Sequence, residues 1–262
     1  MNSVQFEIFS EFRSEFYDYC KKLNENFGAE LMPLQKASAQ KDTPDYPIQT
    51  PVVYNTALDE VYEQSEIRLI VIGDNPGKDE QRSYNRKYLV GQSGKIATGF
   101  FAKNEQFCTN FRKNVLILNK TPIHTAKTNH LKFVLKNGSA NLQKMILESQ
   151  IFMAQKTANL HKNLCKAAKE YGGIEPELWL VGYAELKEKG LFLNYRDELL
   201  NSYDKNNNSE KSAWEKVFVF QHFSMNRFSI DLNNFRKNNP NFSIVQAAST
   251  LGTLHRNEIF GV

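Results

Sequence analysis

The chain has 262 residues, of which 41% are hydrophobic and 24% charged, so it has the composition of a globular protein and the length to bury about 75% of the unfolded chain's surface. Lys and Arg outnumber Asp and Glu by 33 to 29, and the resulting charge of +4 is compatible with a polyanionic partner but does not require one. Three scattered cysteines exclude a disulfide framework and a Cys-x-x-Cys metal site, and no apolar run approaches the ~20 residues of a membrane span. The charged N-terminus lacks the pattern of a signal peptide, so we expect a cytoplasmic protein with reduced thiols.

The first 50 residues predict a helix and a connection that pack on the rest of the chain. Apolar side chains recur at spacings of three and four between residues 4 and 27, as in an amphipathic helix, and Gly28 is expected to end it. Residues 36–51 are polar and contain prolines at positions 44, 47 and 51, which predicts an extended surface connection.

The rest of the chain alternates between expected strands and helices. Short apolar segments at residues 67–72, 115–118, 178–182 and 217–220 are typical of buried parallel strands. Helices are expected at 96–101, at 139–170 and over the last 30 residues with a break at Asn239-Pro240; residues 184–203 are helical or irregular, and 204–212 have the composition of a flexible loop. This order predicts a three-layer α/β/α sandwich with a short, mainly parallel central sheet, forming a single domain over residues 1–262.

Three expected strands are followed by a side chain of a type that takes part in catalysis or binding. Asn75, Asn119 and His222 stand at or just after strand ends. A lone His in this position is usually structural, and Asn in a turn usually bonds the local backbone. However, the carboxyl ends of parallel strands lie along one edge of a sheet, where ligands bind, so we expect the three side chains to share one pocket.

A polar segment follows the first strand. Residues 78–88 contain four basic side chains and two tyrosines, a combination that can contact phosphates and stack on bases, although an ordinary solvated loop explains it equally well. The glycines at 91 and 94 indicate tight turns before a helix, but their spacing matches neither a Walker A loop nor a dinucleotide-binding fingerprint.

Four segments of the chain resemble the motifs of the uracil-DNA glycosylase superfamily, in the family's order and over roughly residues 50–230. Residues 73–77, Gly-Asp-Asn-Pro-Gly, are similar to the Gly-x-Asn-Pro-Gly motif of its mismatch-specific and single-strand-selective branches. Residues 88–95 resemble the Pro-Phe-Val-Gly-x-Ala-Gly-Lys segment of the iron–sulfur branch, residues 114–119 the strand whose last Asn reads uracil, and residues 222–226 the His-Pro-Ser-Pro-x motif.

The resemblance implies a role for each matching residue. Asn75 would position the attacking water, with Asp74 assisting it or capping the next helix, and His222 would stabilise the charge on the departing base. The family's base pocket would be formed by Gly73, Pro76, Gly77, Tyr88, Leu89 and Asn119. Its DNA contacts would be made by Gly91, Ser93, Gly94, Lys95, Ser224, Met225, Asn226 and Arg227.

The chain departs from the family pattern at three points. Three scattered cysteines cannot hold the iron–sulfur cluster of the similar branch, so we expect no cofactor and no metal. Leu89 occupies the position of the aromatic that stacks on uracil, so Tyr88 or Phe101 would have to replace it. Phe223 replaces the Pro that follows the family's His.

The sequence therefore leaves three functions open. The first is a monomeric DNA glycosylase that removes uracil or a related deaminated base from single- or double-stranded DNA, in base excision repair. The second is a module of the same fold that binds nucleic acid or a nucleobase without efficient catalysis, for which Leu89 and Phe223 argue. The third is an unrelated α/β enzyme acting on a nucleotide or another phosphorylated small molecule.

Overall fold

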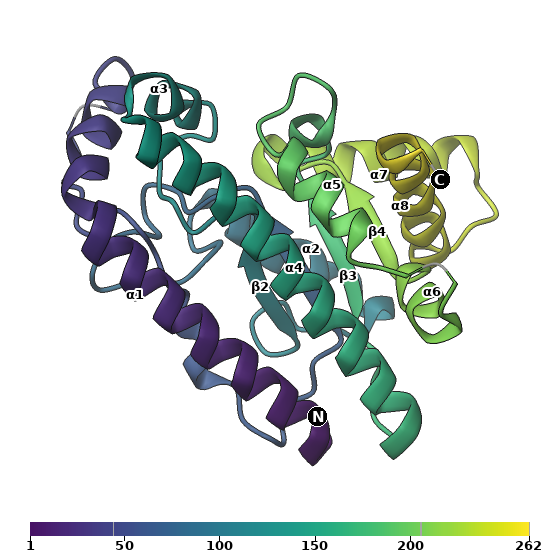
Figure 1. Cartoon of the computed structure of the whole chain (residues 1–262). Coiled ribbons are helices and arrows are strands. Elements are labelled where there is room, and N and C mark those ends of the chain that lie inside the picture. Colours follow the sequence, from purple (N-terminus) through teal and green to yellow (C-terminus); the bar gives the residue numbers. More distant parts are fainter. Residues whose placement is uncertain (44, 205, 262) are drawn as a thin grey trace.

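Four short apolar segments form one parallel sheet at the centre of the protein (Figure 1). In this computed structural model, which describes residues 1–43, 45–204 and 206–261, the strands are β1 (Leu69–Gly73), β2 (Val115–Asn119), β3 (Glu177–Val181) and β4 (Val217–Phe220). Their order is β2-β1-β3-β4, and every pairing is parallel. The predicted α/β class and parallel sheet are confirmed, and each strand lies within two residues of its predicted start.

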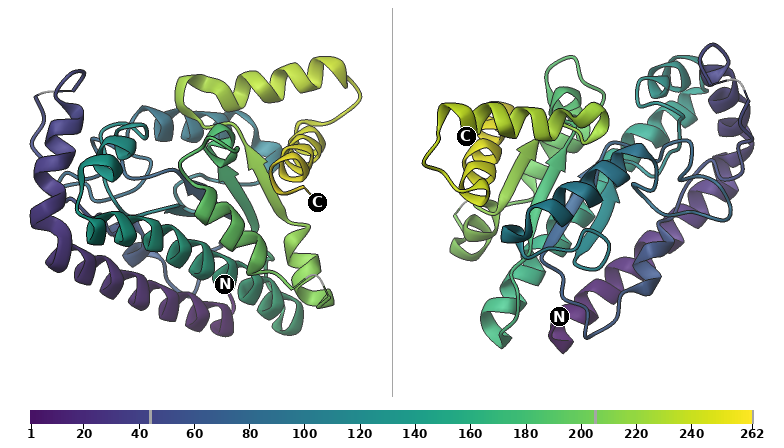
Figure 2. Two further views of the ribbon diagram at one scale, coloured as in Figure 1. Left: turned by 45° about the horizontal axis from the view of Figure 1, so that its top comes forward. Right: turned by 180° about the vertical axis from the view of Figure 1, so that it is seen from behind.

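Helices cover both faces of this sheet, which makes three layers (Figure 2). On one face, Trp179 of β3 contacts the rings of Phe101 and Phe228, at centroid distances of 5.6 and 5.8 Å. These rings belong to α2 (Gln92–Lys103) and α7 (Arg227–Asn238), which share this face with α8 (Ile244–Phe260). The opposite face is covered by α4 (Ala140–Tyr171) and α5 (Leu193–Asn201), and α1 (Ser3–Ala39) and α3 (His130–Asn137) pack beside α4.

The N-terminal helix is longer than the pattern predicts. Gly28 does not end it: α1 is 37 residues long and continues beyond Gly28, through Pro33, to Ala39. A Cβ atom at Gly28 would lie 3.0 Å from Oδ1 of Asn24 and 3.4 Å from Pro51, so this glycine gives the connection room to cross the helix. The predicted extended connection is therefore shorter, and one of its prolines, Pro44, lies outside the described residues.

Two further expectations for local structure were incomplete. The segment predicted as a flexible loop contains a short helix, α6 (Asn208–Trp214), because the Asn207 side chain accepts hydrogen bonds from the N–H groups of Ser209 and Glu210. Lys205 of the same segment lies outside the described residues. Residues 184–203 hold both a 3₁₀ turn, η3 (Tyr183–Leu186), and the helix α5.

A helix that spans a membrane must be both long and apolar. Among the described residues, no helix combines the necessary length with the necessary apolar character.

Candidate functional site

The carboxyl ends of the strands border a pocket of about 520 Å³. Asn75 follows β1, Asn119 ends β2 and His222 follows β4, and all three line this pocket. The pocket lies at the ends of the neighbouring strands β1 and β3, whose onward connections run in opposite directions along the sheet, to β2 and to β4, and this is the usual place for ligands in an open parallel sheet. The three strand ends therefore meet as the parallel arrangement predicts.

Asn119 presents an unpaired hydrogen-bond donor to the pocket. Its side chain is 2% exposed, and its Nδ2 has no hydrogen-bond partner among the described residues. The amide fits there because residue 73 is glycine: a Cβ atom at Gly73 would lie 2.4 Å from Oδ1 of Asn119. An unsatisfied buried donor costs about 1–3 kcal/mol, so its retention at a pocket wall points to a ligand that brings an acceptor.

Asn75 is oriented by two hydrogen bonds. Its Nδ2 donates to Oγ1 of Thr125 at 2.8 Å and to the carbonyl oxygen of Ile123 at 3.2 Å. Because a carbonyl oxygen only accepts, the atom facing Ile123 must be the amide nitrogen. This leaves Oδ1 as the atom that can accept a hydrogen bond from a water molecule or a ligand in the pocket.

The geometry around His222 fixes its tautomer. Nδ1 accepts a hydrogen bond from the backbone N–H of Ser224 at 3.0 Å and lies 2.8 Å from Oγ of Ser224. Burial lowers the pKa of His222; the carboxylate of Asp74 opposes this shift and the ammonium of Lys120 supports it. A neutral ring whose Nδ1 accepts carries its proton on Nε2, so His222 offers a neutral N–H donor to the pocket.

Asp74 is held by a lysine from the neighbouring strand end. Lys120 is fully buried, and its Nζ lies 2.6 Å from Oδ1 of Asp74 and 2.6 Å from the carbonyl oxygen of Val181. Gly182, with φ = 95°, permits this arrangement, because a Cβ atom there would lie 2.3 Å from Oδ1 of Asp74. The ion pair thus joins the ends of β1, β2 and β3 beneath the pocket and balances the charge of the pocket carboxylate.

A second carboxyl group, that of Glu80, lines the pocket and is buried. Its oxygens accept hydrogen bonds from the N–H groups of Gly77 at 3.2 Å and Leu89 at 3.0 Å. Burial raises its pKa from 4.5 to about 7, and these two hydrogen bonds oppose the shift. Gly77 lines the pocket as expected, but its N–H group already donates to Glu80 and is not free for a ligand.

Most of the predicted site residues line the pocket. Besides the three strand-end residues, the pocket is lined by Asp74, Gly77, Leu89, Ser93, Ser224, Met225 and Arg227. Gly73, Pro76, Gly91 and Gly94 lie outside its wall and shape the backbone instead. A Cβ atom at Gly94, for example, would lie 1.4 Å from the Leu89 carbonyl oxygen, so glycine lets α2 begin against that loop. Lys95 and Asn226 line a neighbouring groove.

The expected stacking aromatics are not at the pocket. Tyr88 is 1% exposed, and its hydroxyl donates to the carbonyl oxygen of Val53 in the core, so its assignment to the base pocket is wrong. Phe101 is buried against Phe111 and Trp179. Among the described residues that line the pocket, His222 carries the only aromatic ring.

The positive charge of the polar segment at residues 78–88 is partly neutralised by ion pairs. Arg82 lies 3.8 Å from Asp79, and Lys87 pairs with Glu60. Tyr84 is 74% exposed, so it is the tyrosine of this segment that remains available to a partner.

The residues of the site that were not identified from the sequence include Glu80, Lys120 and Thr125. Lys120 carried a usable signal, since it directly follows Asn119 at a strand end. Glu80 stands in a run of polar residues, and Thr125 lies six residues beyond β2. Neither position is marked by a local pattern.

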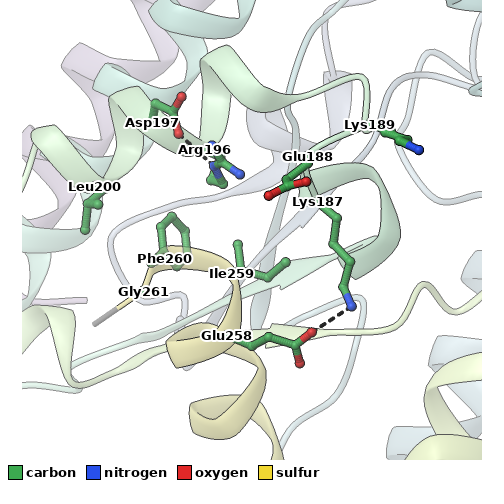
Figure 3. Close-up of a pocket in the computed structure, with 10 residues that line it drawn as sticks. All are labelled: Lys187, Glu188, Lys189, Arg196, Asp197, Leu200, Glu258, Ile259, Phe260 and Gly261. Atoms are coloured by element: carbon green, nitrogen blue, oxygen red, sulfur yellow. Dashed lines mark hydrogen bonds and ion pairs between the residues drawn. The ribbon is translucent and has the colours of Figure 1, made fainter.

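A different cavity, of about 650 Å³, lies between the η3–α5 segment and the end of α8 (Figure 3). Its walls carry cations and carboxylates in equal number, and two pairs form there: Lys187 with Glu258 at 2.7 Å and Arg196 with Asp197 at 2.7 Å. None of the residues expected at the site lines it.

Metal-ligating side chains do not cluster in the described part of the chain: no group of three or more His, Cys, Asp or Glu residues there can hold an ion. No protein-family model matches the chain, and no curated protein or solved structure is significantly similar to it.

Proposed function

We propose that the protein is a DNA glycosylase that hydrolyses the N-glycosidic bond of uracil, or of a related deaminated base, in DNA. Two observations support this proposal: the four segments that resemble uracil-DNA glycosylase motifs, and the chemistry of the pocket to which all four contribute residues. The observation that carries most weight is that the buried, unpaired Nδ2 of Asn119 and the neutral N–H donor of His222 line the same pocket, because uracil has carbonyl oxygens that could accept from both.

In the proposed reaction, the base enters the pocket after leaving the DNA stack, at a cost of a few kcal/mol. Nδ2 of Asn119 donates to O4 of uracil. As the C1′–N1 bond breaks, its electron pair passes to the base, and Nε2–H of His222 donates to O2, where negative charge develops. A neutral donor suits this role because stabilising charge at the transition state requires only a preoriented dipole.

The water that completes the reaction is positioned by Asn75. Its Oδ1 is free to accept a hydrogen bond from water, since Nδ2 is held by Thr125 and Ile123. The water oxygen bonds to C1′, and the proton it loses is balanced by protonation of the released base. The carboxylate of Asp74, held in place by Lys120, favours the positive charge that develops on the sugar.

Contacts to DNA would come from the loop after β4 and the start of α2. Met225 is 68% exposed and, like Asn226, has a left-handed backbone with φ near 50°, which projects the loop tip from the surface. An apolar side chain in this place can fill the gap that a flipped base leaves, while Ser93, Ser224 and Arg227 contact phosphates. The proposal includes a uracil-DNA glycosylase-like arrangement of the fold and a monomeric enzyme.

The test is base release from oligonucleotides that contain uracil, in single and double strands, detected as strand cleavage after alkali. Wild-type protein should create alkali-sensitive sites, and Asn75→Ala should lower the rate by orders of magnitude while leaving folding and DNA binding nearly unchanged. Asn234→Ala, at an exposed position on α7, is the matched control. If wild-type protein leaves both substrates uncut while a known glycosylase cuts them, the proposal fails.

A second function, binding without catalysis, is favoured by one observation. Leu89 lines the pocket where the resemblance expects an aromatic, and neither Tyr88 nor Phe101 replaces it. Without that stacking surface, base–aromatic stacking of about 1–3 kcal/mol is missing from the pocket. Tight, salt-dependent binding of uracil-containing DNA without any base release would identify a binding module.

A further inference from the structure

A groove of about 560 Å³ lies between α2 and α7, next to the pocket. The two helices lie on the same side of the sheet (Figure 2), and a ring contact between Phe100 and Phe228, at 4.8 Å, joins them. Apolar residues Ile96, Phe100 and Ile244 contribute to the groove, and its remaining wall is polar or basic.

The charge of this groove has one sign. Lys95, Lys103 and Arg236 line it, and no described residue among its lining is acidic. None of these three side chains forms a hydrogen bond or an ion pair within residues 1–43, 45–204 and 206–261, and Nε of Arg236 is buried without a partner. Such a cluster contrasts with the cavity beside α8, where lysine and arginine are paired with carboxylates. Three unpaired cations in one groove attract an anion.

The groove continues the pocket along the surface. Asn226 lines the groove, while its neighbours Met225 and Arg227 line the pocket. At the start of α2, Gln92 lines the groove and Ser93 the pocket. A bound polymer with one of its units in the pocket can therefore continue directly into the groove between α2 and α7.

We infer that this groove holds the sugar–phosphate backbone of the DNA strand next to the target nucleotide. The inference rests on the proposed function for its choice of DNA as the polyanion. Each phosphate of a strand is an anion that a groove cation can pair with, and the side-chain amides of Gln92 and Asn233 supply further donors to phosphate oxygens. The contacts are independent of sequence, so they extend the binding site beyond the flipped base without restricting which bases surround it.

Removing charge from the groove tests the inference. Binding of a fluorescently labelled single-stranded 20-nucleotide DNA that contains no uracil is measured by anisotropy at several salt concentrations, so that the result does not depend on base release. The double variant Lys103→Gln/Arg236→Gln should bind at least 10-fold more weakly at low salt. Its slope of log affinity against log salt should be less negative by about 1.4, because each phosphate of a single strand that a cation neutralises contributes about 0.7 to that slope. Lys21→Gln, on the exposed face of α1 and without an ion pair among the described residues, is the control for removal of a charge elsewhere.

Gly99 allows a second test that does not risk the fold. It lies inside α2 at the groove, and a Cβ atom there would meet no described atom within 4 Å. Gly99→Glu replaces a poor helix former with a good one and places a carboxylate in the groove. The melting temperature should stay the same or rise while DNA affinity falls at least 10-fold; Gly99→Ala, which adds only a methyl group, should bind as wild type does.

The outcomes separate this inference from the proposed function. If the groove variants bind DNA like wild type, the inference is overturned, even where Asn75→Ala abolishes base release. If they bind weakly and no protein releases any base, the groove assignment stands and the glycosylase proposal fails. A competition with inorganic phosphate provides the last comparison. If inorganic phosphate displaces the oligonucleotide at a concentration equal to that of the oligonucleotide's own phosphates, the groove is a small-anion site and the inference is wrong.

Discussion

The buried ion pair between Lys120 and Asp74 gives the clearest test of how the strand ends are held together. In the variant Lys120→Met, the carboxylate of Asp74, which is 8% exposed, loses its counter-charge, and the carbonyl of Val181 loses its donor. Breaking one side of a buried pair costs about 3–5 kcal/mol, a large part of the total stability of about 5–15 kcal/mol. We therefore expect Lys120→Met to lose about 3–5 kcal/mol of the free energy of unfolding at 25 °C.

The comparison should be made by urea unfolding at pH 7, followed by far-UV circular dichroism. Lys87→Met is the matched control, because Lys87 and its partner Glu60 are 38% and 65% exposed and such pairs contribute about 0–1 kcal/mol. The double variant Asp74→Asn/Lys120→Met removes both charges and should recover most of the missing stability, since a neutral pair carries no uncompensated charge. A decrease for Lys120→Met within about 1 kcal/mol of the Lys87→Met control would refute this reasoning.

Three further predictions concern individual side chains of the site and of the core. His222→Asn should lower the rate of base release by about 10²–10³. Ser224→Ala should lower it less than about tenfold, because the backbone N–H of Ser224 still donates to Nδ1 of His222. Single-turnover rates on the uracil oligonucleotide measure both effects. In the proposed reaction, ionised Glu80 would oppose the negative charge on the departing base, so kcat/KM should fall as pH rises through about 7. Glu80→Gln should flatten that profile, and an unchanged profile in the variant would exclude Glu80 as its origin. His161, whose pKa burial lowers from 6.5 to about 4, is protonated first in the unfolded chain, so it destabilises the fold as pH falls from 6.5 toward 4. The stability difference between wild type and His161→Asn should shrink by about 3 kcal/mol between pH 7 and pH 4 in urea unfolding, and a constant difference would contradict the shift.

The sheet was predictable because its strands are continuous apolar runs that end abruptly in polar residues. Each of the four runs is buried on both faces, and that condition is visible in a single sequence. The break between the last two helices was equally visible, and Ser243 with Gln246 forms a capping box at the start of α8. Helix ends that depend on contacts with distant residues were not predictable. In the sequence Gly28 resembles a helix stop, and only the structure shows that it makes room for Pro51.

For the site, the sequence by itself determined that Asn75, Asn119 and His222 stand at the ends of parallel strands, and that alone predicts a shared pocket. Only the tertiary structure decided which of their atoms are free, since the partners of Asn75 lie 48 and 50 residues away in the chain. Likewise, only the structure shows that the Tyr88 side chain points into the core and that Lys120 pairs with Asp74, 46 residues away in the chain. Local pattern reports whether a side chain is buried, because burial depends on periodicity along one element. It does not report what lies opposite that side chain, because the partner is chosen by how separate elements pack.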